Sequence, residues 1–118
     1  RGRRLRVLGR LDDVIVTGGE NVHPSEVEAI LLTCPNVREA CVFGHQDPVW
    51  GQIVCAALKL VPGAGVDPEH IKTTCARYLS PSRMPRKFCI LDHIPLNPNG
   101  KHNRVETARV ATPLLQDL

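Results

Sequence analysis

Residues 18–28 read GGENVHPSEVE, in which a glycine pair is followed closely by proline and glutamates. Adjacent glycines permit positive φ angles, so Gly18-Gly19 predicts a turn. Pro24 fits the first position of a helix, and the glutamates favour the positive end of the helix dipole. Apolar residues then repeat at helical spacing: Val27, Ile30 and Leu31. The stretch therefore predicts a turn and then a helix with one buried face.

Stretches with strand-like patterns lie on both sides of this predicted helix. Upstream, Leu5–Val7 and Val14–Val16 flank Gly9–Asp13, which predicts an N-terminal hairpin. Downstream, Ile53–Val61 is almost continuously apolar, as in a strand buried on both faces. Two shorter stretches complete the predicted sheet: Val37–Phe43 and Lys87–Leu91.

Two further helices follow from local signals. Asp67 precedes a proline and can cap one of them. Asn103 can cap the other, and Glu106 completes a capping-box pattern. The polar segment 44–51 predicts a loop, and the tail at 114–118 is expected to fray. The predicted class is α+β: an N-terminal β-hairpin followed by a small, mainly three-stranded sheet packed with about three helices.

Length and composition limit the chain to one modest domain. It has 118 residues, of which 42% are hydrophobic and 23% charged, and these proportions exclude a disordered, collagen-like or coiled-coil protein. No apolar run approaches the roughly 20 residues of a membrane span. No signal peptide is visible either.

The net charge of +3 comes from one end of the chain. Five arginines fall within the first ten residues, which contain no acidic residue, and the remainder is slightly acidic. Aromatic residues make up only 3% of the chain, too few for the stacking platforms that bind single-stranded nucleic acids. We therefore expect no nucleic-acid partner.

The cysteines and histidines show no metal or disulfide pattern. The cysteines are odd in number and have no C-x-x-C spacing: Cys34, Cys41, Cys55, Cys75 and Cys89. The five histidines are scattered, so no metal site is expected. Reduced, structural cysteines are typical of a cytoplasmic protein.

A loop at residues 95–101, PLNPNGK, ends on Lys101. Its two prolines restrict φ and Asn99-Gly100 favours a turn, so the loop is expected to be rigid. A rigidly held ammonium can form an ion pair with a phosphate or a carboxylate. A solvated lysine after a tight turn is the alternative interpretation. The segment is not a phosphate-binding P-loop, because His102 replaces the required serine or threonine.

A second unusual segment, GRLDD at residues 9–13, precedes the glycine pair. Arg10 can clamp a phosphate or remain solvated. The aspartates Asp12 and Asp13 can coordinate a cation, although turn amides are their commoner partners. The helix that follows Gly18-Gly19 can receive an anion at its N-terminus.

Other polar groups have weaker claims to a site. His45, Asp47 and Trp50 share one segment and are assigned to packing. A serine hydrolase built on Ser80 or Ser82 is excluded, because the chain has no G-x-S-x-G motif.

The unusual segments together, residues 9–15, 18–28 and 95–101, closely resemble the C-terminal domain of the adenylate-forming enzymes. This superfamily includes acyl-CoA synthetases, peptide-synthetase adenylation domains and firefly luciferase. The resemblance covers essentially the whole chain, with hinge and loops in the expected order. GGENV-x-P-x-EVE is most similar to acyl- or aryl-CoA ligases, including the O-succinylbenzoate–CoA ligase type.

The resemblance implies a role for several residues. Lys101 matches the catalytic lysine of acyl-adenylate formation, and Arg10 matches an arginine near the nucleotide phosphates or ribose. Asp12 matches the hinge about which this lid rotates after adenylation. Gly18, Gly19 and Glu20 match the face that then admits the pantetheine arm of coenzyme A (CoA).

The resemblance also implies partners. We expect ATP, CoA and a small carboxylic acid as substrates, and a large N-terminal domain that is absent from residues 1–118. Mg²⁺ is expected with ATP and bound mainly outside this domain. The isolated lid is expected to be inactive. His102-Asn103 departs from the family pattern, in which an aliphatic residue and an acidic one usually follow the lysine.

Two alternatives remain open at this point. The lid can belong to an adenylation domain that loads a carrier protein in place of free CoA. The chain can also be a small basic module that binds acidic partners or nucleic acid through the arginines of residues 1–10.

Overall fold

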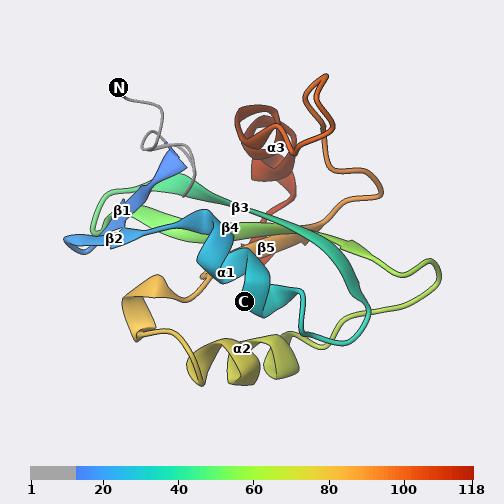
Figure 1. Ribbon diagram of the computed structural model, residues 1–118. Coiled ribbons are helices and arrows are strands. Elements are labelled where there is room, and N and C mark those ends of the chain that lie inside the picture. Colours follow the sequence, from blue (N-terminus) through green and yellow to red (C-terminus); the bar gives the residue numbers. More distant parts are fainter. Residues whose placement is uncertain (1–12) are drawn as a thin grey trace.

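A six-stranded sheet with helices on both faces organises residues 13–118, the part of the chain that this computed structural model describes (Figure 1). The elements in chain order are β1 (Ile15–Thr17), β2 (Glu20–Val22), α1 (Pro24–Leu31), β3 (Val37–Asp47), β4 (Gly51–Leu60), α2 (Pro68–Ala76), the 3₁₀ turn η3 (Pro81–Arg83), β5 (Lys87–Ile90), α3 (Arg104–Ala111), the 3₁₀ turn η4 (Thr112–Leu114) and β6 (Gln116–Asp117). The α+β class is confirmed.

The described structure begins with a hairpin made by β1 and β2. These strands pair antiparallel, with Ile15 opposite Val22 and the turn at Gly18-Gly19. The turn expected from the glycine pair is therefore present, and it joins two strands. The first strand of the hairpin expected upstream, Leu5–Val7, lies outside the described residues.

The long hairpin of β3 and β4 contains the two longest strands of the sheet. Its register runs without a break from Glu39 opposite Lys59 to Asp47 opposite Gly51. The loop predicted at 44–51 is therefore wrong, since β3 continues to Asp47. The Asp47 carboxylate accepts hydrogen bonds from the backbone N–H groups of Val49 and Trp50, and this closes a short turn after a long strand.

Strand β4 occupies the centre of the sheet. It pairs antiparallel with β3 and parallel with β5, and Gly51 at its start meets Thr17 of β1. A parallel partner requires a crossover, which α2 provides. The three strands predicted for the sheet are β3, β4 and β5, and three short strands extend it.

The C-terminal tail is ordered by strand pairing. Strand β6 pairs antiparallel with β5, and the N–H of Leu118 donates to the carbonyl of Arg86 over 3.0 Å. The predicted fraying of residues 114–118 is therefore wrong. Free N–H and C=O groups at the edge of β5 supply partners that local sequence signals do not reveal.

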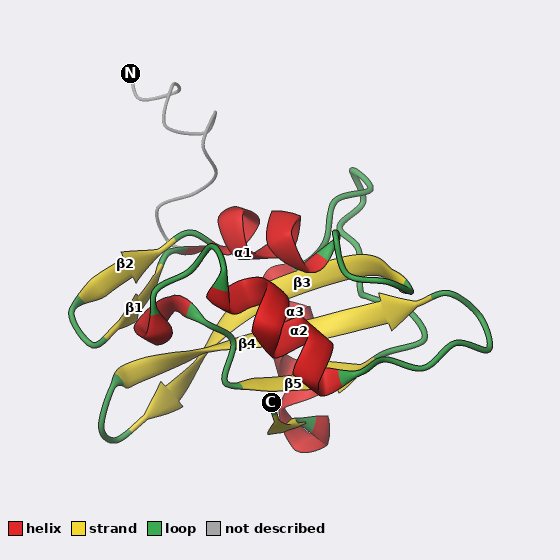
Figure 2. Cartoon of the chain, turned by 90° about the horizontal axis from the view of Figure 1, so that it is seen from below, coloured by secondary structure: helices red, strands yellow, loops and turns green. Residues whose placement is uncertain are grey.

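Each face of the sheet packs on its own apolar core. Helices α1 and α2 cover one face, and Figures 1 and 2 both show them together on that side, with α3 on the other. Alternate residues of β4 point to opposite cores, because Val54 and Leu58 pack towards α1 and α2 whereas Cys55 and Ala57 pack towards α3. The strand is therefore buried on both faces, as its sequence predicts.

The helix caps follow the sequence signals in part. Asp67 caps α2 and Asn103 caps α3, each through a side-chain oxygen. The second half of the capping box at α3 is wrong. Glu106 pairs with Arg109, and the N–H of Asn103 donates to the carbonyl of Pro95 instead. No helix within residues 13–118 has the length and apolar character to cross a membrane.

Candidate functional site

The loop that carries Lys101 is closed by its own backbone. Leu96 and His102 form an isolated β-bridge, and the N–H of Asn97 donates to the carbonyl of Lys101 over 2.7 Å. Gly100 has a φ of +86°, which suits glycine. Lys101 is exposed at the tip, and its ammonium pairs with no acidic side chain within residues 13–118.

The C-terminal side of this loop is anchored to the sheet. His102 Nε2 lies 3.0 Å from Glu39 Oε1 on β3, and Glu39 also lies 3.7 Å from the ammonium of Lys59. The hydrogen bond from His102 lowers the pKa of the Glu39 carboxyl. His102 and the capping residue Asn103 therefore have structural roles here, even though they depart from the family pattern.

Arg104, the first residue of α3, forms a cluster of charged side chains with Glu28 and Asp13, called the Arg104 cluster below. Its Nη1 donates to Glu28 Oε2 of α1 and, over 2.7 Å, to the carbonyl of Val42. Its Nε lies 3.6 Å from the carboxylate of Asp13. Burial alone would lower the pKa of Arg104, but the hydrogen bond and charge of Glu28 outweigh it and raise that pKa.

The glycine turn lies against Trp50, at the far end of the β3–β4 hairpin. Gly18 has a φ of +57°, and its N–H donates to the carbonyl of Trp50 over 3.0 Å. A Cβ on Gly18 would lie 2.9 Å from the indole ring. A Cβ on Gly19, where φ is +84°, would meet nothing within 4 Å. A side chain at position 18 would therefore collide with Trp50, whereas one at position 19 would project into open space in the described part of the chain.

Glu20, which directly follows this turn, is hydrogen-bonded to residues in and next to η3, and these contacts are called the Glu20 brace below. Its carboxylate accepts hydrogen bonds from Ser82 Oγ at 2.7 Å, Arg83 Nε at 3.0 Å and Ser80 Oγ at 3.4 Å. The bond from Ser82, followed by that from Arg83, lowers the pKa of Glu20. The guanidinium of Arg86 stacks 4.4 Å from the centre of the Trp50 ring.

The sequence alone does not reveal this brace. In sequence, Ser80 and Ser82 are candidates only for hydrolase nucleophiles, and Arg83 and Arg86 belong to no recognisable motif. The contacts join residues about sixty positions apart, and no local pattern in one sequence encodes such a separation.

The Glu20 brace predicts a pH-dependent stability. A carboxyl whose pKa falls on folding stabilises the native state above its ordinary pKa of 4.5, and this contribution is lost as the pH falls through the lowered value. We expect Glu20→Gln to lower the melting temperature at pH 7, and the difference from the wild type to be smaller at pH 3, below the ordinary pKa of the carboxyl. Thermal melts at both pH values measure this.

Glu69→Gln is the matched control, because Glu69 is highly exposed and lies 4.0 Å from Lys72, its only cationic partner among residues 13–118. Its effect at pH 7 should be the smaller one. A Glu20→Gln difference that persists unchanged at pH 3 would contradict the ionic role of Glu20.

The structure does not bring the Lys101 loop and the glycine turn together. The loop is anchored at Glu39, near the start of β3, and the turn is held by Trp50, just beyond its end. Eight residues of strand separate Glu39 from Asp47, which corresponds to about 27 Å at the usual rise per residue. The two candidate sites thus occupy opposite ends of one strand pair. Arg10 and Asp12 lie outside the described residues.

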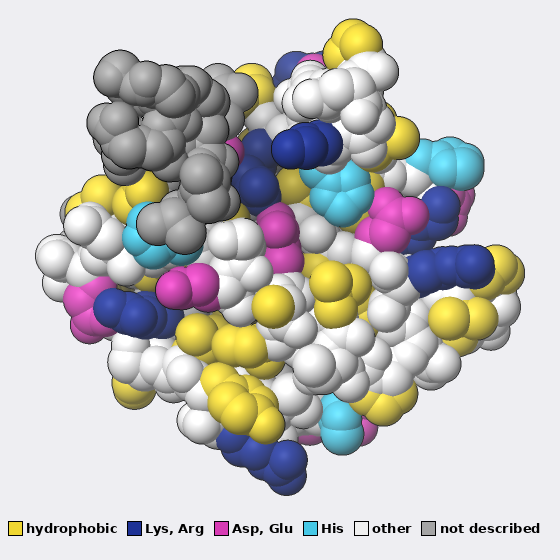
Figure 3. All heavy atoms as spheres, viewed as in Figure 1, with side chains coloured by type: hydrophobic (Ala, Val, Ile, Leu, Met, Phe, Trp, Pro, Cys, Tyr) yellow, Lys and Arg dark blue, Asp and Glu magenta, His cyan; other side chains and the backbone are white. Residues whose placement is uncertain are grey.

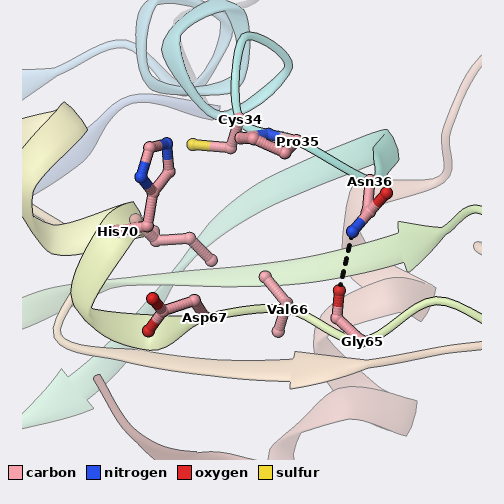
Figure 4. A pocket seen from close by; sticks show the side chains of 8 residues that line it. Cys34, Pro35, Asn36, Gly65, Val66, Asp67 and His70 are labelled. Atoms are coloured by element: carbon pink, nitrogen blue, oxygen red, sulfur yellow. Dashed lines mark hydrogen bonds between the residues drawn. The ribbon is translucent and has the colours of Figure 1, made fainter.

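A pocket of about 330 Å³, lined by no residue of the lysine loop or the glycine turn, lies between the α1–β3 connection and the start of α2 (Figure 4). His70 and Cys34 face each other across it, and Asn36 Nδ2 donates to the carbonyl of Gly65 over 3.2 Å. Burial raises the pKa of the Cys34 thiol. The thiol is therefore held in its neutral form, unsuited to nucleophilic chemistry.

All five cysteines are buried and free. Their burial agrees with the interpretation of these residues as structural, and their reduced state stays a prediction. Figure 3 shows one face of the molecule, on which Lys and Arg side chains are interspersed with acidic, apolar and uncharged groups.

Comparison with known proteins gives consistent matches. A family model of the AMP-binding enzyme C-terminal domain matches residues 26–101. The 4-chlorobenzoate–CoA ligase of Pseudomonas sp. (strain CBS-3) is 46% identical over 96 residues, covering 80% of this chain and 18% of the relative. The 2-succinylbenzoate–CoA ligase of Geobacillus sp. (strain WCH70) is 41% identical over 97 residues, covering 82% and 20%.

Solved structures agree. The o-succinylbenzoate CoA synthetase of Bacillus subtilis, in complex with its acyl-adenylate intermediate, matches with a TM-score of 0.79 and 38% identity over 84% of this chain and 20% of that one. ATP-bound MatB from Rhodopseudomonas palustris matches with a TM-score of 0.82 and 30% identity over 88% and 21%. The chain thus spans about a fifth of the length of these relatives.

Proposed function

Since this chain belongs to the family of AMP-binding enzyme C-terminal domains, we propose that it is the lid of an ATP-dependent carboxylic acid–CoA ligase. In the proposed reaction, a carboxylate oxygen attacks the α-phosphorus of ATP and pyrophosphate leaves. The CoA sulfur then attacks the carbonyl of the acyl-adenylate, and AMP leaves. A large domain supplies the remainder of the site, in keeping with the fifth of each relative that this chain covers.

Lys101 serves the first of these steps. Its ammonium bridges the acid and the phosphate, which brings two anions together and stabilises the charge of the transition state. The closed backbone of its loop and the anchor at Glu39 support this role, because they hold at a fixed place a cation that pairs with no acidic side chain among residues 13–118.

Gly18, Gly19 and Glu20 serve the second step. The open space beside Gly19 leaves room for the pantetheine arm, and a side chain there would obstruct it. Glu20 contributes through the brace that fixes the turn, because its carboxylate is already engaged by Ser82 and Arg83.

The observation that carries the proposal is the placement of these two groups at opposite ends of the β3–β4 hairpin. One reaction centre cannot receive both ends at once, so the domain has to rotate between the steps. Asp12 is the proposed hinge, and Arg10 is proposed to contact the phosphates or ribose of ATP. Mg²⁺ is expected to accompany ATP on the large domain; residues 13–118 hold no group of three or more metal-binding side chains.

The compartment we propose is the cytoplasm. Five free cysteines, all buried, suit a reducing environment in which thiols are not oxidised to disulfides.

The proposal is tested on the complete polypeptide that carries this chain. With a panel of aromatic and aliphatic acids, we expect acid-dependent exchange of pyrophosphate into ATP, and release of AMP on addition of CoA. Exchange without CoA-dependent release would support a carrier protein as the acceptor. No exchange with any acid, together with salt-sensitive binding of DNA in a filter assay, would favour the basic module.

A further inference from the structure

Arg104 contacts residues that lie far from its own helix in the sequence. It stands three positions after Lys101 and joins four parts of the fold: α3, α1, the edge of β3 and the segment before β1. We propose that Arg104 is a positioning residue for Lys101, which couples the placement of the lysine loop to the position of Asp13. This inference rests on the proposed function and adds a residue to it.

The first link runs from Arg104 to the sheet. The N–H of Val42 donates to Glu28 Oε2 over 2.8 Å, and the carbonyl of Val42 accepts from Arg104 Nη1. The ion pair of Glu28 and Arg104 therefore completes the hydrogen bonds of Val42 at the free edge of β3. Because Val42 is fully buried, this contact fixes the start of α3 against the strand.

The second link runs from α3 to the lysine loop. Asn103 caps α3 through the N–H of Glu106 and donates its own N–H to the carbonyl of Pro95. The cap and the first residue of α3 are thus part of the base of the loop. A shift of the Arg104 backbone would therefore displace Asn103 and Pro95, and with them the loop that carries Lys101.

The third link runs from Arg104 to Asp13. The Nε–H of Arg104 is buried and has no hydrogen-bond partner within residues 13–118. The Asp13 carboxylate lies 3.6 Å from this nitrogen, close enough for an ion pair but beyond a normal hydrogen bond. A movement of Asp13 by less than 1 Å would complete the bond. Asp13 directly follows Asp12, so a rotation at the proposed hinge would change this contact.

The chemistry of the site requires arginine. The planar guanidinium can address Glu28, Val42 and Asp13 at the same time, whereas the ammonium of lysine acts as a single point charge. Arg104→Lys keeps the charge and loses this geometry. Asp13→Asn keeps the shape of the side chain and removes its charge, and so tests the third link alone.

The experiment compares three variants of the complete polypeptide. Arg104→Lys and Asp13→Asn are the test variants. Arg109→Lys is the matched control on the same helix, because its side chain is highly exposed and, within the described part of the chain, pairs only with Glu106. Hydrogen–deuterium exchange of the peptide covering residues 95–103 reports on the loop directly, whatever the activity. The rates of pyrophosphate exchange and of thioester formation from supplied acyl-adenylate are measured as well.

We expect both test variants to speed amide exchange in residues 95–103 and to change the ratio of the two rates by about fivefold or more, as a coupling between sites predicts. The control should alter neither. Amide exchange that stays at the wild-type rate in Asp13→Asn would overturn the inference, and so would a rate ratio within twofold of the wild type. Should Arg104→Lys fail to fold, Asp13→Asn decides alone. Absence of acid-dependent exchange in the wild type would instead refute the proposed function.

Discussion

Replacing Lys101 with alanine is expected to reduce acid-dependent pyrophosphate exchange in the complete enzyme by about 10²–10³-fold, the usual cost of removing one electrostatic stabiliser of a transition state. The exposed ammonium takes no part in the folded structure of residues 13–118, so stability should change little. Thioester formation from supplied acyl-adenylate should remain within about threefold of the wild type, because the proposed rotation moves the lysine end away from the reaction centre before that step.

Two further variants sharpen this test. Lys101→Arg retains the charge but replaces a compact ammonium with a planar fork, so we expect only partial recovery of exchange. Lys72→Ala removes an exposed lysine on α2, on the opposite face of the sheet from α3, and should leave both rates unchanged. If Lys101→Ala retained wild-type exchange, the assignment of the catalytic lysine would be wrong.

The second large effect is expected at Gly19 and falls on the other half-reaction. Gly19→Leu should slow thioester formation by about a hundredfold, since misplacement of a reacting group by about 1 Å can cost that much. Pyrophosphate exchange should be affected far less. Rapid-quench assays with supplied acyl-adenylate and varied CoA measure the first rate.

Backbone strain has to be separated from obstruction in this experiment. A leucine at positive φ costs on the order of 1–3 kcal/mol wherever it is placed. Gly63 is a matched control, because its φ of +79° and its empty surroundings resemble those of Gly19, whereas it lies in the loop between β4 and α2. Gly63→Leu should therefore lower stability equally without slowing thioester formation. Equal slowing by both substitutions would refute an acceptor channel at Gly19.

Much of the fold could be predicted because its signals are local. Continuous apolar sequence predicted that β4 is buried on both faces, and proline with a preceding cap predicted the start of α2. The extension of β3 to Asp47 could not be predicted in this way, because its polar end satisfies a loop pattern equally well. The pairing of the C-terminal tail with β5 depends on a partner edge thirty residues away.

In the candidate site, too, local motifs could be recognised from the sequence, whereas contacts between distant residues could not. The lysine loop and the glycine turn are contiguous motifs, so their resemblance to the family could be recognised from the sequence. The Glu20 brace and the Arg104 cluster could not be recognised, because each joins elements sixty or more residues apart through charged side chains that look solvated in sequence. Only the packing of η3 against β2, and of α1 and α3 each against β3, makes them partners.

The burial of every cysteine has a practical consequence for spectroscopy. Burial raises the pKa of Cys55 to about 12 and those of Cys75 and Cys89 to about 11, and the remaining two thiols are also shifted upwards by burial. Maleimide reagents require an accessible thiolate, so the native domain should remain unlabelled at neutral pH. A single cysteine introduced at exposed Asn99 would then be the labelled position of the domain. A fluorophore or spin label there would report whether the lysine end moves as the proposed rotation requires, without prior removal of the native thiols of this domain.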